Sequence, residues 1–240
     1  MTEVSGPGCL LVALSHPDDE VGCLGTIAKH RALGARVVML FLTRGEMTEA
    51  LGPRSAEEIG AERARHAEHV ARMLGCETRF LDYQDTRVEV SVLAIHRIAS
   101  IVAEVKPDAV LTWGDAWVRG MRHPDHQATG QIVRGAVTLA RIKRVVTPIE
   151  PHRSVAPVFA LRDRHSNLPC AAFDVSAHFD AILEIARYYH SQVGWPDEAW
   201  LVQRLRVAGH RWGVAAAEEF DAWESVPGLR RSLFGDYLPV

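Results

Sequence analysis

Two short segments of the sequence, "SHPDDE" at 15–20 and "RHPDHQ" at 122–127, place histidine beside aspartate. The first follows a run of aliphatic residues and puts three carboxylates, at 18–20, next to His16. Neighbouring like charges repel one another, so a purely structural loop gains little from this composition. A cation bound among these side chains would remove the repulsion, and imidazole and carboxylate groups together suit Zn²⁺. The segment therefore predicts a metal site.

The tripeptide His-Pro-Asp occurs in both segments, each time after an apolar run and before a helical pattern. In open α/β sheets, ligands bind at the carboxyl ends of the strands. The strands expected at 9–15 and 108–113 can lie close together in such a sheet, so that their loops face each other. Each proline restricts the preceding histidine to an extended conformation, and a residue three positions on can return to the same side. Four candidate ligands result: His16, Asp19, His123 and His126.

Each segment also has a purely structural interpretation. The acidic residues at 18–20 suit the N-cap and first turn of a helix, where the helix dipole favours negative charge. His123 and His126 suit the start of a capped helix. The matched placement of the two segments favours one shared metal site over two separate caps.

Strand-like and helix-like segments alternate along the chain, and this alternation predicts the scaffold that positions the two loops. Strands are expected at 9–15, 35–43, 76–83 and 108–113, and helices at 21–34, 55–75, 90–107 and 126–143. The polar, turn-rich stretch 45–60 is typical of a long loop over a site. Further strands are expected at 156–162 and 170–175, with a helix at 177–192 and a helical tail from Trp195.

This order predicts an α/β fold, a Rossmann-like three-layer sandwich whose mostly parallel sheet carries helices on both faces. The length of 240 residues is long for one domain and short for two, so we expect 1–240 to form a single domain.

Composition and charge limit the classes of partner that the protein is expected to bind. The formal net charge of −3 gives no attraction toward nucleic acid or an anionic membrane, and the short basic run "ARIKRVV" is typical of a solvated helix end. No segment reaches the roughly 18 apolar residues that span a bilayer. We expect a cytoplasmic protein with a small-molecule partner and the possibility of a homo-oligomer. The four cysteines lack a C-x-x-C pair and are expected to be buried free thiols.

The two His-Pro-Asp segments resemble the signatures of the zinc-dependent N-acetylglucosaminyl deacetylases of the LmbE-like/PIG-L superfamily. The family's first motif reads (A/S)HPDDE and its second reads HPDH, and both stand intact here. The stretches "LTRGE", "ARMLG" and "YYHSQ" extend the resemblance over about residues 10–192. It implies the same Rossmann-like fold and the deacetylation of an N-acetylated amino sugar or its conjugate. Glucosaminyl-malate and glucosaminyl-inositol conjugates, chitin fragments and glycosylated antibiotics are the candidate substrates.

The resemblance also implies roles for individual residues. His16, Asp19 and His126 would bind Zn²⁺, which another divalent ion can replace in such a site. Asp18 would act as the general base toward the attacking water. His123 would act as a general acid or as an electrostatic partner of the tetrahedral intermediate.

Several further residues have a functional and a structural interpretation. Asp125 would fix the tautomer of a ligand histidine or cap a helix. Arg63 would contact substrate or be an exposed helix residue, and Glu46 would support the site or be a solvated loop residue. His66 stands where the family is expected to carry a glutamate, and Met121 where some relatives carry a tyrosine. Five aromatic residues would line a sugar pocket or pack in the core: Trp113, Trp117, Tyr188, Tyr189 and Trp195.

Two other classes of protein remain open on the sequence. A metal-dependent phosphoesterase would use a similar cluster, but two-metal sites need more converging carboxylates than the sequence identifies. A nucleotide-binding Rossmann-like protein lacks its glycine-rich fingerprint here, because carboxylates follow the first strand. A serine hydrolase is disfavoured, since no G-x-S-x-G motif occurs. Selectivity among substrates is expected to reside in the loops at 46–60, 84–90 and 114–122.

Overall fold

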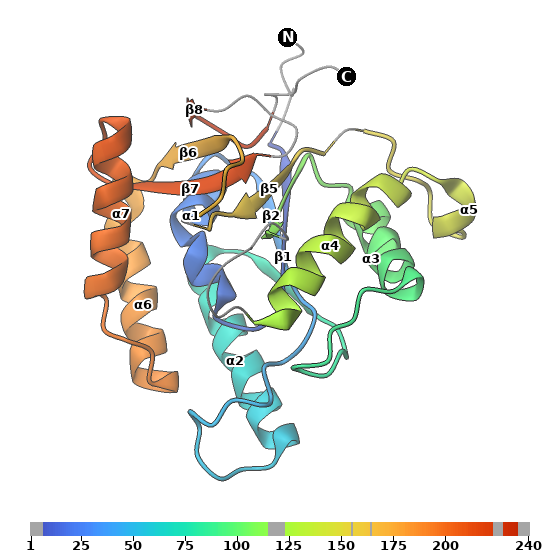
Figure 1. Ribbon diagram of the computed structural model, residues 1–240, viewed down its shortest axis with the longest axis horizontal. Helices are drawn as coiled ribbons and strands as arrows, with labels where there is room; N and C mark the ends of the chain where they lie inside the picture. The colour runs from blue at the N-terminus through green and yellow to red at the C-terminus, as the bar shows by residue number, and fades with distance from the viewer. Residues whose placement is uncertain (1–6, 115–122, 155, 164, 223–227, 235–240) are drawn as a thin grey trace.

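One eight-stranded sheet forms the centre of the molecule (Figure 1). The computed structural model describes residues 7–114, 123–154, 156–163, 165–222 and 228–234. The strands follow the spatial order β3-β2-β1-β4-β5-β7-β6-β8. The first five strands in this order are parallel to one another, whereas β7 is antiparallel to both of its neighbours, β5 and β6. Their bounds are β1 Cys9–Leu14, β2 Arg36–Phe41, β3 Glu77–Phe80, β4 Ala109–Trp113, β5 Val158–Leu161, β6 Cys170–Asp174, β7 Ala217–Ala222 and β8 Gly228–Arg230.

The central strands are buried on both faces, which explains their continuous apolar sequence. Because side chains alternate along a strand, Leu10, Val12 and Leu14 of β1 join the core on one face of the sheet. Leu11 and Ala13 join the core on the other face. Helices must therefore cover both faces.

Two helical layers do so. On one face lie α1 (Leu24–Ala32), α2 (Ala56–Leu74) and α6 (Phe179–Val193), and α7 (Ala199–Trp212) joins the same core beside β7. On the other face lie α3 (Val92–Val105), α4 (Pro124–Leu139) and the short α5 (Lys143–Val146). The predicted three-layer sandwich with a mostly parallel sheet is confirmed.

Most predicted elements are confirmed within a few residues, with four corrections. The helix expected at 21–34 begins as a 3₁₀ turn at Asp19–Gly22 before α1 starts. The loop expected at 45–60 ends early, because the Ser55 capping box starts α2 at Ala56. The helix expected at 126–143 starts at Pro124 and ends at Leu139. The tail from Trp195 contributes α7 and also β7 and β8, which the sequence did not indicate.

The two His-Pro-Asp loops leave neighbouring strands. β1 pairs in parallel with β4, with Leu10 opposite Ala109 and Ala13 opposite Thr112, so both loops emerge at one edge of the sheet. α4 then packs very close to β4 at Gly130, where an added Cβ would lie 2.3 Å from the Trp113 carbonyl oxygen. This close approach fixes how far α4 stands from the loop after β1.

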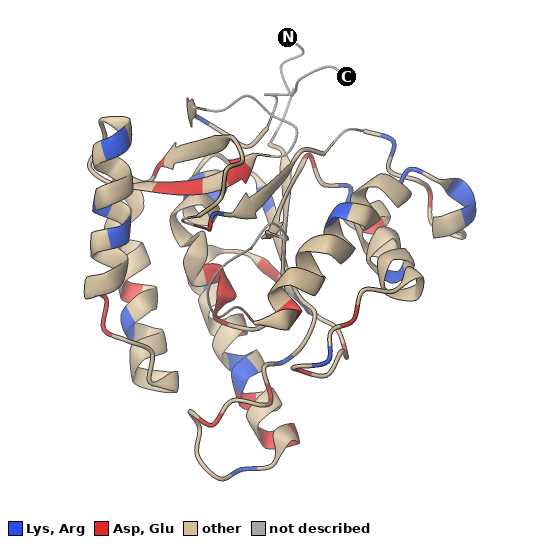
Figure 2. Ribbon diagram, viewed as in Figure 1, with Lys and Arg blue, Asp and Glu red and all other residues tan. Residues whose placement is uncertain are grey.

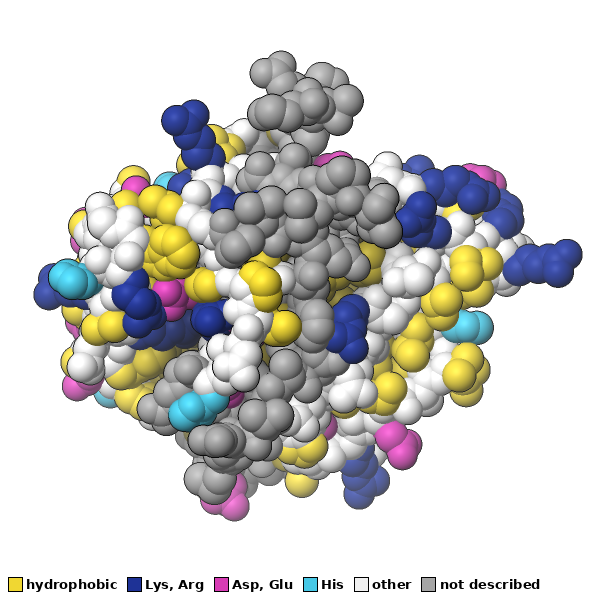
Figure 3. Space-filling model, turned by 45° about the horizontal axis from the view of Figure 1, so that its top comes forward, with side chains coloured by type: hydrophobic (Ala, Val, Ile, Leu, Met, Phe, Trp, Pro, Cys, Tyr) yellow, Lys and Arg dark blue, Asp and Glu magenta, His cyan; other side chains and the backbone are white. Residues whose placement is uncertain are grey.

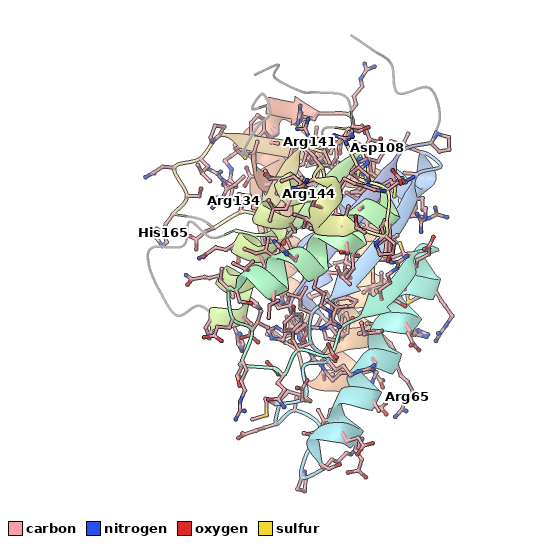
Figure 4. The ribbon with its side chains drawn as sticks, turned by 90° about the vertical axis from the view of Figure 1, so that its right-hand side faces the viewer. Arg65, Asp108, Arg134, Arg141, Arg144 and His165 are labelled. Carbon is pink, nitrogen blue, oxygen red and sulfur yellow. The ribbon has the colours of Figure 1, made fainter. Side chains whose placement is uncertain are left out.

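Charge is distributed over the surface. Figure 2 shows Lys and Arg spread over α2, α4, α5 and α7. Arg141 and Arg144 of the "ARIKRVV" segment are exposed near α5, as Figure 4 shows, which agrees with the prediction of a solvated helix end. Among the described residues, no helix has the length and hydropathy needed to cross a membrane. The four cysteines are free; two are buried and two are half-buried.

Candidate metal centre and active site

Local backbone geometry aims the first His-Pro-Asp segment inward. After β1 the chain turns at Asp18, whose φ of 97° lies in the left-handed region, and enters the 3₁₀ turn at Asp19. A non-glycine residue in that conformation is strained, and such strain is concentrated at functional sites. In the second segment, His123 is the N-cap of α4 and Pro124 occupies the first turn. Both turns place their histidines at the same edge of the sheet.

Three of the four candidate ligands form a tight triangle. His126 Nε2 lies 3.2 Å from His16 Nδ1 and 3.2 Å from Asp19 Oδ1. His16 Nδ1 lies 3.7 Å from Asp19 Oδ2. Tetrahedral Zn²⁺ with bonds of about 2.0–2.1 Å separates neighbouring ligand atoms by about 3.3–3.4 Å. The chemistry of these donors fits one tetrahedral ion with a position left for water. Two of the separations are close to the expected value, but the third is measured to Asp19 Oδ2, whereas Oδ1 faces His126. A single oxygen of Asp19 therefore reaches both imidazoles only after the carboxylate turns, and Asp19 is not among the described donors whose single ligand atoms lie within 4.8 Å of one another.

The Asp19 carboxylate is held in place by three N–H donors on one of its oxygens. Oδ2 accepts hydrogen bonds from Ser15 N at 3.0 Å, His16 N at 2.9 Å and Trp113 Nε1 at 2.8 Å. These bonds leave Oδ1 directed at His126. Trp113 also stacks on His126, with ring centroids 3.8 Å apart and planes 7° from parallel. One tryptophan at the end of β4 thus orients two candidate ligands.

The second ring nitrogen of His16 faces two buried carboxylates. His16 Nε2 lies 3.0 Å from Asp85 Oδ1 and 3.2 Å from Asp125 Oδ2. Asp125 is itself held by the backbone N–H groups of Thr86, at 2.8 Å, and Val88, at 3.1 Å. A carboxylate on the far nitrogen of a ligand histidine fixes the tautomer that presents the other nitrogen to a metal.

The electrostatics of this cluster favour a bound cation. Burial lowers the pKa of His16, but Asp125, Asp19 and Asp85 outweigh it and raise the pKa to about 12. Burial raises the pKa of Asp19, but His126 and His16 outweigh it and hold the pKa well below its usual value. Several carboxylates thus share a poorly solvated space that only positive charge stabilises.

A second donor set overlaps the first. One ligand atom from each of His16, Asp85, His123 and Asp125 lies within 4.8 Å of the others, and His16, His123 and His126 meet the same limit. The set of four residues that contains Asp85 would use His16 Nε2, the ring nitrogen that lies 3.2 Å from Asp125 Oδ2. The two arrangements are therefore distinguished by which ring nitrogen of His16 holds the ion.

Asp18 lies beside the triangle with one oxygen engaged. Its Oδ2 lies 3.1 Å from Arg63 Nη1 and accepts a hydrogen bond from Trp195 Nε1 at 2.8 Å. Its Oδ1 has no hydrogen bond to any residue that the structure describes. Burial raises the pKa of the Asp18 carboxyl, and Arg63 opposes the shift. The carboxylate is fixed in orientation and keeps one oxygen for a ligand.

His123 lies on the open side of the cluster, with 34% of its side chain exposed. Its Nδ1 accepts a hydrogen bond from the backbone N–H of Asp125 at 3.3 Å, so a neutral ring carries its proton on Nε2. Nε2 lies 3.9 Å from Asp85 Oδ1. Burial lowers the pKa of His123, and His16 adds to this shift.

The remaining predicted residues lie around this centre. Arg63 is only 6% exposed, so the alternative of an exposed helix residue is wrong; its guanidinium contacts Asp18 and the Pro17 carbonyl. Glu46 is half-buried and accepts a hydrogen bond from Asp85 N at 2.8 Å, so it supports the loop that carries Asp85. His66 is buried and faces Glu62.

The predicted aromatic residues divide between cavity and core. Trp113 and Trp195 line the cavity, whereas Tyr189 is 1% exposed and donates a hydrogen bond to Glu20. Trp117 and Met121 lie outside the described residues.

Sequence reasoning missed Asp85. It lies in the loop after β3 and contacts His16 from a third strand end. The available signal was an aspartate shortly after a predicted strand, in "DYQDTRV", within a loop expected to influence selectivity.

A large cavity of about 1210 Å³ opens from the triangle. Ligand pockets for drug-sized molecules measure about 300–1,000 Å³, so this space exceeds what one small ligand fills. Its walls include Asp18, Arg63, Trp113 and Trp195, and it continues toward α7.

The fold and the site together define a class: an α/β sandwich whose strand ends gather imidazole and carboxylate ligands at the head of a cavity. The family model of GlcNAc-PI de-N-acetylase, PIG-L, matches residues 11–137, more than half of the chain. The chain belongs to this family, and the resemblance seen in the two His-Pro-Asp motifs is confirmed.

Several named proteins are similar to this chain. A probable N-acetyl-alpha-D-glucosaminyl L-malate deacetylase 2 of Bacillus anthracis is 31% identical over 143 residues, which cover 56% of this chain and 62% of that protein. A 1D-myo-inositol 2-acetamido-2-deoxy-alpha-D-glucopyranoside deacetylase of Actinosynnema mirum is 27% identical in an alignment 279 positions long, which covers 97% of this chain and 98% of that protein. The N,N'-diacetylchitobiose deacetylase of Pyrococcus horikoshii superposes with a TM-score of 0.77 at 26% identity, over 92% of this chain and 87% of that one.

Proposed function

We propose that the protein is a metal-dependent N-deacetylase that hydrolyses the N-acetyl amide of an amino sugar or its conjugate and releases acetate. The observation that carries this proposal is the convergence of His16, Asp19 and His126, whose closest donor atoms lie 3.2–3.7 Å apart, with the Asp18 carboxylate beside them. The relatives named as deacetylases of glucosaminyl conjugates support the substrate class.

The donor set supports Zn²⁺ as the ion, held by His16, Asp19 and His126. When bound, such an ion acts as a Lewis acid that lowers the pKa of water and polarises an amide carbonyl. Imidazole and carboxylate also bind other divalent metals. The proposal of zinc as the physiological metal rests on the chemistry of these donors.

Asp18 is the general base in this proposal. Arg63 and Trp195 hold its Oδ2, so Oδ1 can accept a proton from the attacking water. Water oxygen then bonds to the amide carbon as that proton moves to Asp18. General-base assistance of this kind contributes about 10²–10⁴-fold to a rate.

His123 serves the second half of the reaction. The carbon–nitrogen bond of the amide breaks, and the departing amine needs a proton. His123 Nε2 carries a hydrogen when Nδ1 accepts from the Asp125 backbone, and its ring faces the open side of the cluster. A neutral imidazole that gave up its only proton would become an imidazolate, so His123 stabilises the intermediate through this Nε2–H. The proton that Asp18 takes from the water passes on to the departing amine. Asp125 and Glu46 maintain the surrounding geometry. Arg63 stays a predicted substrate contact.

Predictions about domain organisation, location and partners also stay proposals. They are one domain over 1–240, a cytoplasmic location, no nucleic-acid or membrane partner, and a possible homo-oligomer.

Acetate release by the zinc-loaded protein tests the function, with the glucosaminyl-inositol and glucosaminyl-malate N-acetyl conjugates as substrates. Asp18→Asn should keep bound zinc and lose about 10²–10⁴-fold in turnover. The matched control Asp82→Asn changes an exposed aspartate paired with Arg97 and should retain the parent rate. Full activity in Asp18→Asn would show that the base is assigned wrongly, and hydrolysis of p-nitrophenyl phosphate without any acetate release would favour a phosphoesterase.

A further inference from the structure

The cavity extends well past the metal centre, along one face of α7. Trp200, Arg204, Ala208 and Trp212 all line it, and their spacing of four residues places them on a single face of the helix. Twelve residues of α-helix span about 18 Å. The cavity wall therefore provides a second region, separate from the triangle, that a single acetamido sugar does not fill.

Arg204 stands in the middle of this face, and it forms no ion pair with a described residue. The neighbouring arginines that line the cavity are paired, Arg162 with Asp221 and Arg211 with Glu219. Within the described parts of the chain, no carboxylate oxygen lies within 4.0 Å of the Arg204 guanidinium. A half-buried cation that lines a cavity with no carboxylate in direct contact favours an anionic ligand.

The protein contacts of Arg204 leave most of its donors available. Its one hydrogen bond to a described residue runs from Nη2 to the Gly22 carbonyl at 3.3 Å, and a guanidinium has five N–H groups. The buried carboxylate of Glu218 interacts electrostatically with Arg204 at longer range, but its two oxygens accept the backbone N–H groups of Gly25 at 2.8 Å and Thr26 at 2.7 Å. The planar fork of Arg204 can therefore bind a carboxylate or a phosphate through two parallel hydrogen bonds.

Aromatic side chains connect this arginine with the candidate base. Trp195 donates its Nε1–H to Asp18 and packs against Trp200, with ring centroids 5.7 Å apart. Trp200 and Arg204 are one helical turn apart on α7. A ligand that presents its amide at Asp18 and passes along the two tryptophans thus reaches Arg204. Figure 3 shows basic and hydrophobic side chains side by side at the left of the molecule, where α7 lies.

We propose that the face of α7 around Arg204 is a second subsite that binds an anionic aglycone of the amino-sugar conjugate, through a carboxylate or phosphate group. The inference rests on the proposed deacetylase function and adds to it the chemical class of the group attached to the sugar. Arg204 is a specificity-determining residue in this account, remote from the reacting atoms.

Three substrates with the same acetamido sugar test the subsite in the unsubstituted, zinc-loaded protein. They are N-acetylglucosaminyl-malate, which carries carboxylates, N-acetylglucosamine 1-phosphate, and the neutral N-acetylglucosaminyl-inositol. We expect kcat/KM for at least one anionic substrate to exceed that for the neutral one by at least tenfold, and the preferred anion identifies carboxylate or phosphate. Equal or better use of the neutral conjugate than of both anions would overturn the proposal.

Substitution of Arg204 gives the second test. Arg204→Gln should lower kcat/KM at least tenfold for the preferred anionic substrate, mainly through KM, and less than threefold for the neutral one; Arg204→Lys should recover part of the loss. The control Arg206→Gln changes an exposed arginine of the same helix that lies over Phe179, and should leave every rate within twofold. Equal losses on both kinds of substrate, in a variant with the parent's unfolding temperature, would exclude anion recognition by Arg204.

The outcomes separate this inference from the function beneath it. If Arg204→Gln does not fold, the substrate preference of the unsubstituted protein decides the question. Acetate release with no anionic preference would remove the α7 subsite and leave the deacetylase standing. Absence of acetate release from all three substrates would instead contradict the proposed function.

Discussion

Replacing Trp113 by phenylalanine tests whether the surroundings of the metal centre hold its ligands in place. The change removes the Nε1–H that Asp19 Oδ2 accepts at 2.8 Å, one of three N–H donors on that oxygen. It keeps an aromatic ring over His126, which Trp113 stacks against at 3.8 Å. Among the candidate ligands, the change therefore removes one hydrogen bond, the one to Asp19, and keeps the ring contact with His126.

The expected loss follows from that bond. A hydrogen bond to a charged, buried acceptor contributes about 1.5–3 kcal/mol. Because every 1.4 kcal/mol corresponds to a factor of about ten, zinc affinity should fall about 10- to 150-fold. Freed of one restraint, the Asp19 carboxylate can also rotate away from the direction that points Oδ1 at His126.

Competition with a chromophoric chelator at fixed pH measures this affinity. Trp212→Phe is the matched control, since it removes an Nε1–H that Glu219 accepts, also at 2.8 Å, away from the triangle. It should leave zinc affinity within about twofold. Parent-like zinc binding in Trp113→Phe would refute the reasoning that this hydrogen bond prepares Asp19 for the metal.

Two further predictions concern stability and packing. Burial lowers the pKa of His30 to about 4, and its ring nitrogens bond to a backbone carbonyl and a backbone N–H. The unfolded chain takes up a proton at His30 below about pH 6.5 that the folded protein refuses until about pH 4. His30 should therefore contribute a loss of about 2–3 kcal/mol to the free energy of unfolding between pH 7.5 and 4.5, measured by urea unfolding as the difference between the parent and His30→Gln. His30→Gln should lack this component, and identical pH slopes in both proteins would contradict it. Gly130→Ala should lower the unfolding temperature and zinc affinity, because its Cβ would lie 2.3 Å from the Trp113 carbonyl oxygen; Gly135→Ala, whose nearest contact is 3.3 Å away, is the control that should retain zinc affinity.

The scaffold could be predicted because strands that are buried on both faces consist of apolar residues, which are visible in the sequence. β1 and β2 are buried on both faces, so their apolar runs identified them, and Gly75 in the left-handed conformation marked the end of α2. β7 was missed because it carries Glu218 and Asp221 in the interior. Those carboxylates are accommodated by the start of α1 and by Arg162, partners that only the folded chain brings near.

The candidate site likewise contains residues that the sequence identified and one that depends on tertiary contacts. The repeated His-Pro-Asp motif placed His16 and His126 at adjacent strand ends, and the pairing of β1 with β4 brings them together. Asp85 belongs to no motif, and only its place in a loop shortly after a predicted strand marks it. Its position depends on Glu46, which accepts its backbone N–H, and on the loop contacts that hold Asp125. Such tertiary contacts leave no periodic trace in the sequence.

The most direct test of the metal centre is a crystal structure of the protein with one equivalent of Zn²⁺, with the ion located by its anomalous scattering. We expect one ion about 2.0–2.2 Å from His16 Nδ1, Asp19 Oδ1 and His126 Nε2, with its remaining position facing Asp18. An ion bound instead through His16 Nε2 with Asp85 and His123, leaving Asp19 and His126 unligated, would contradict it.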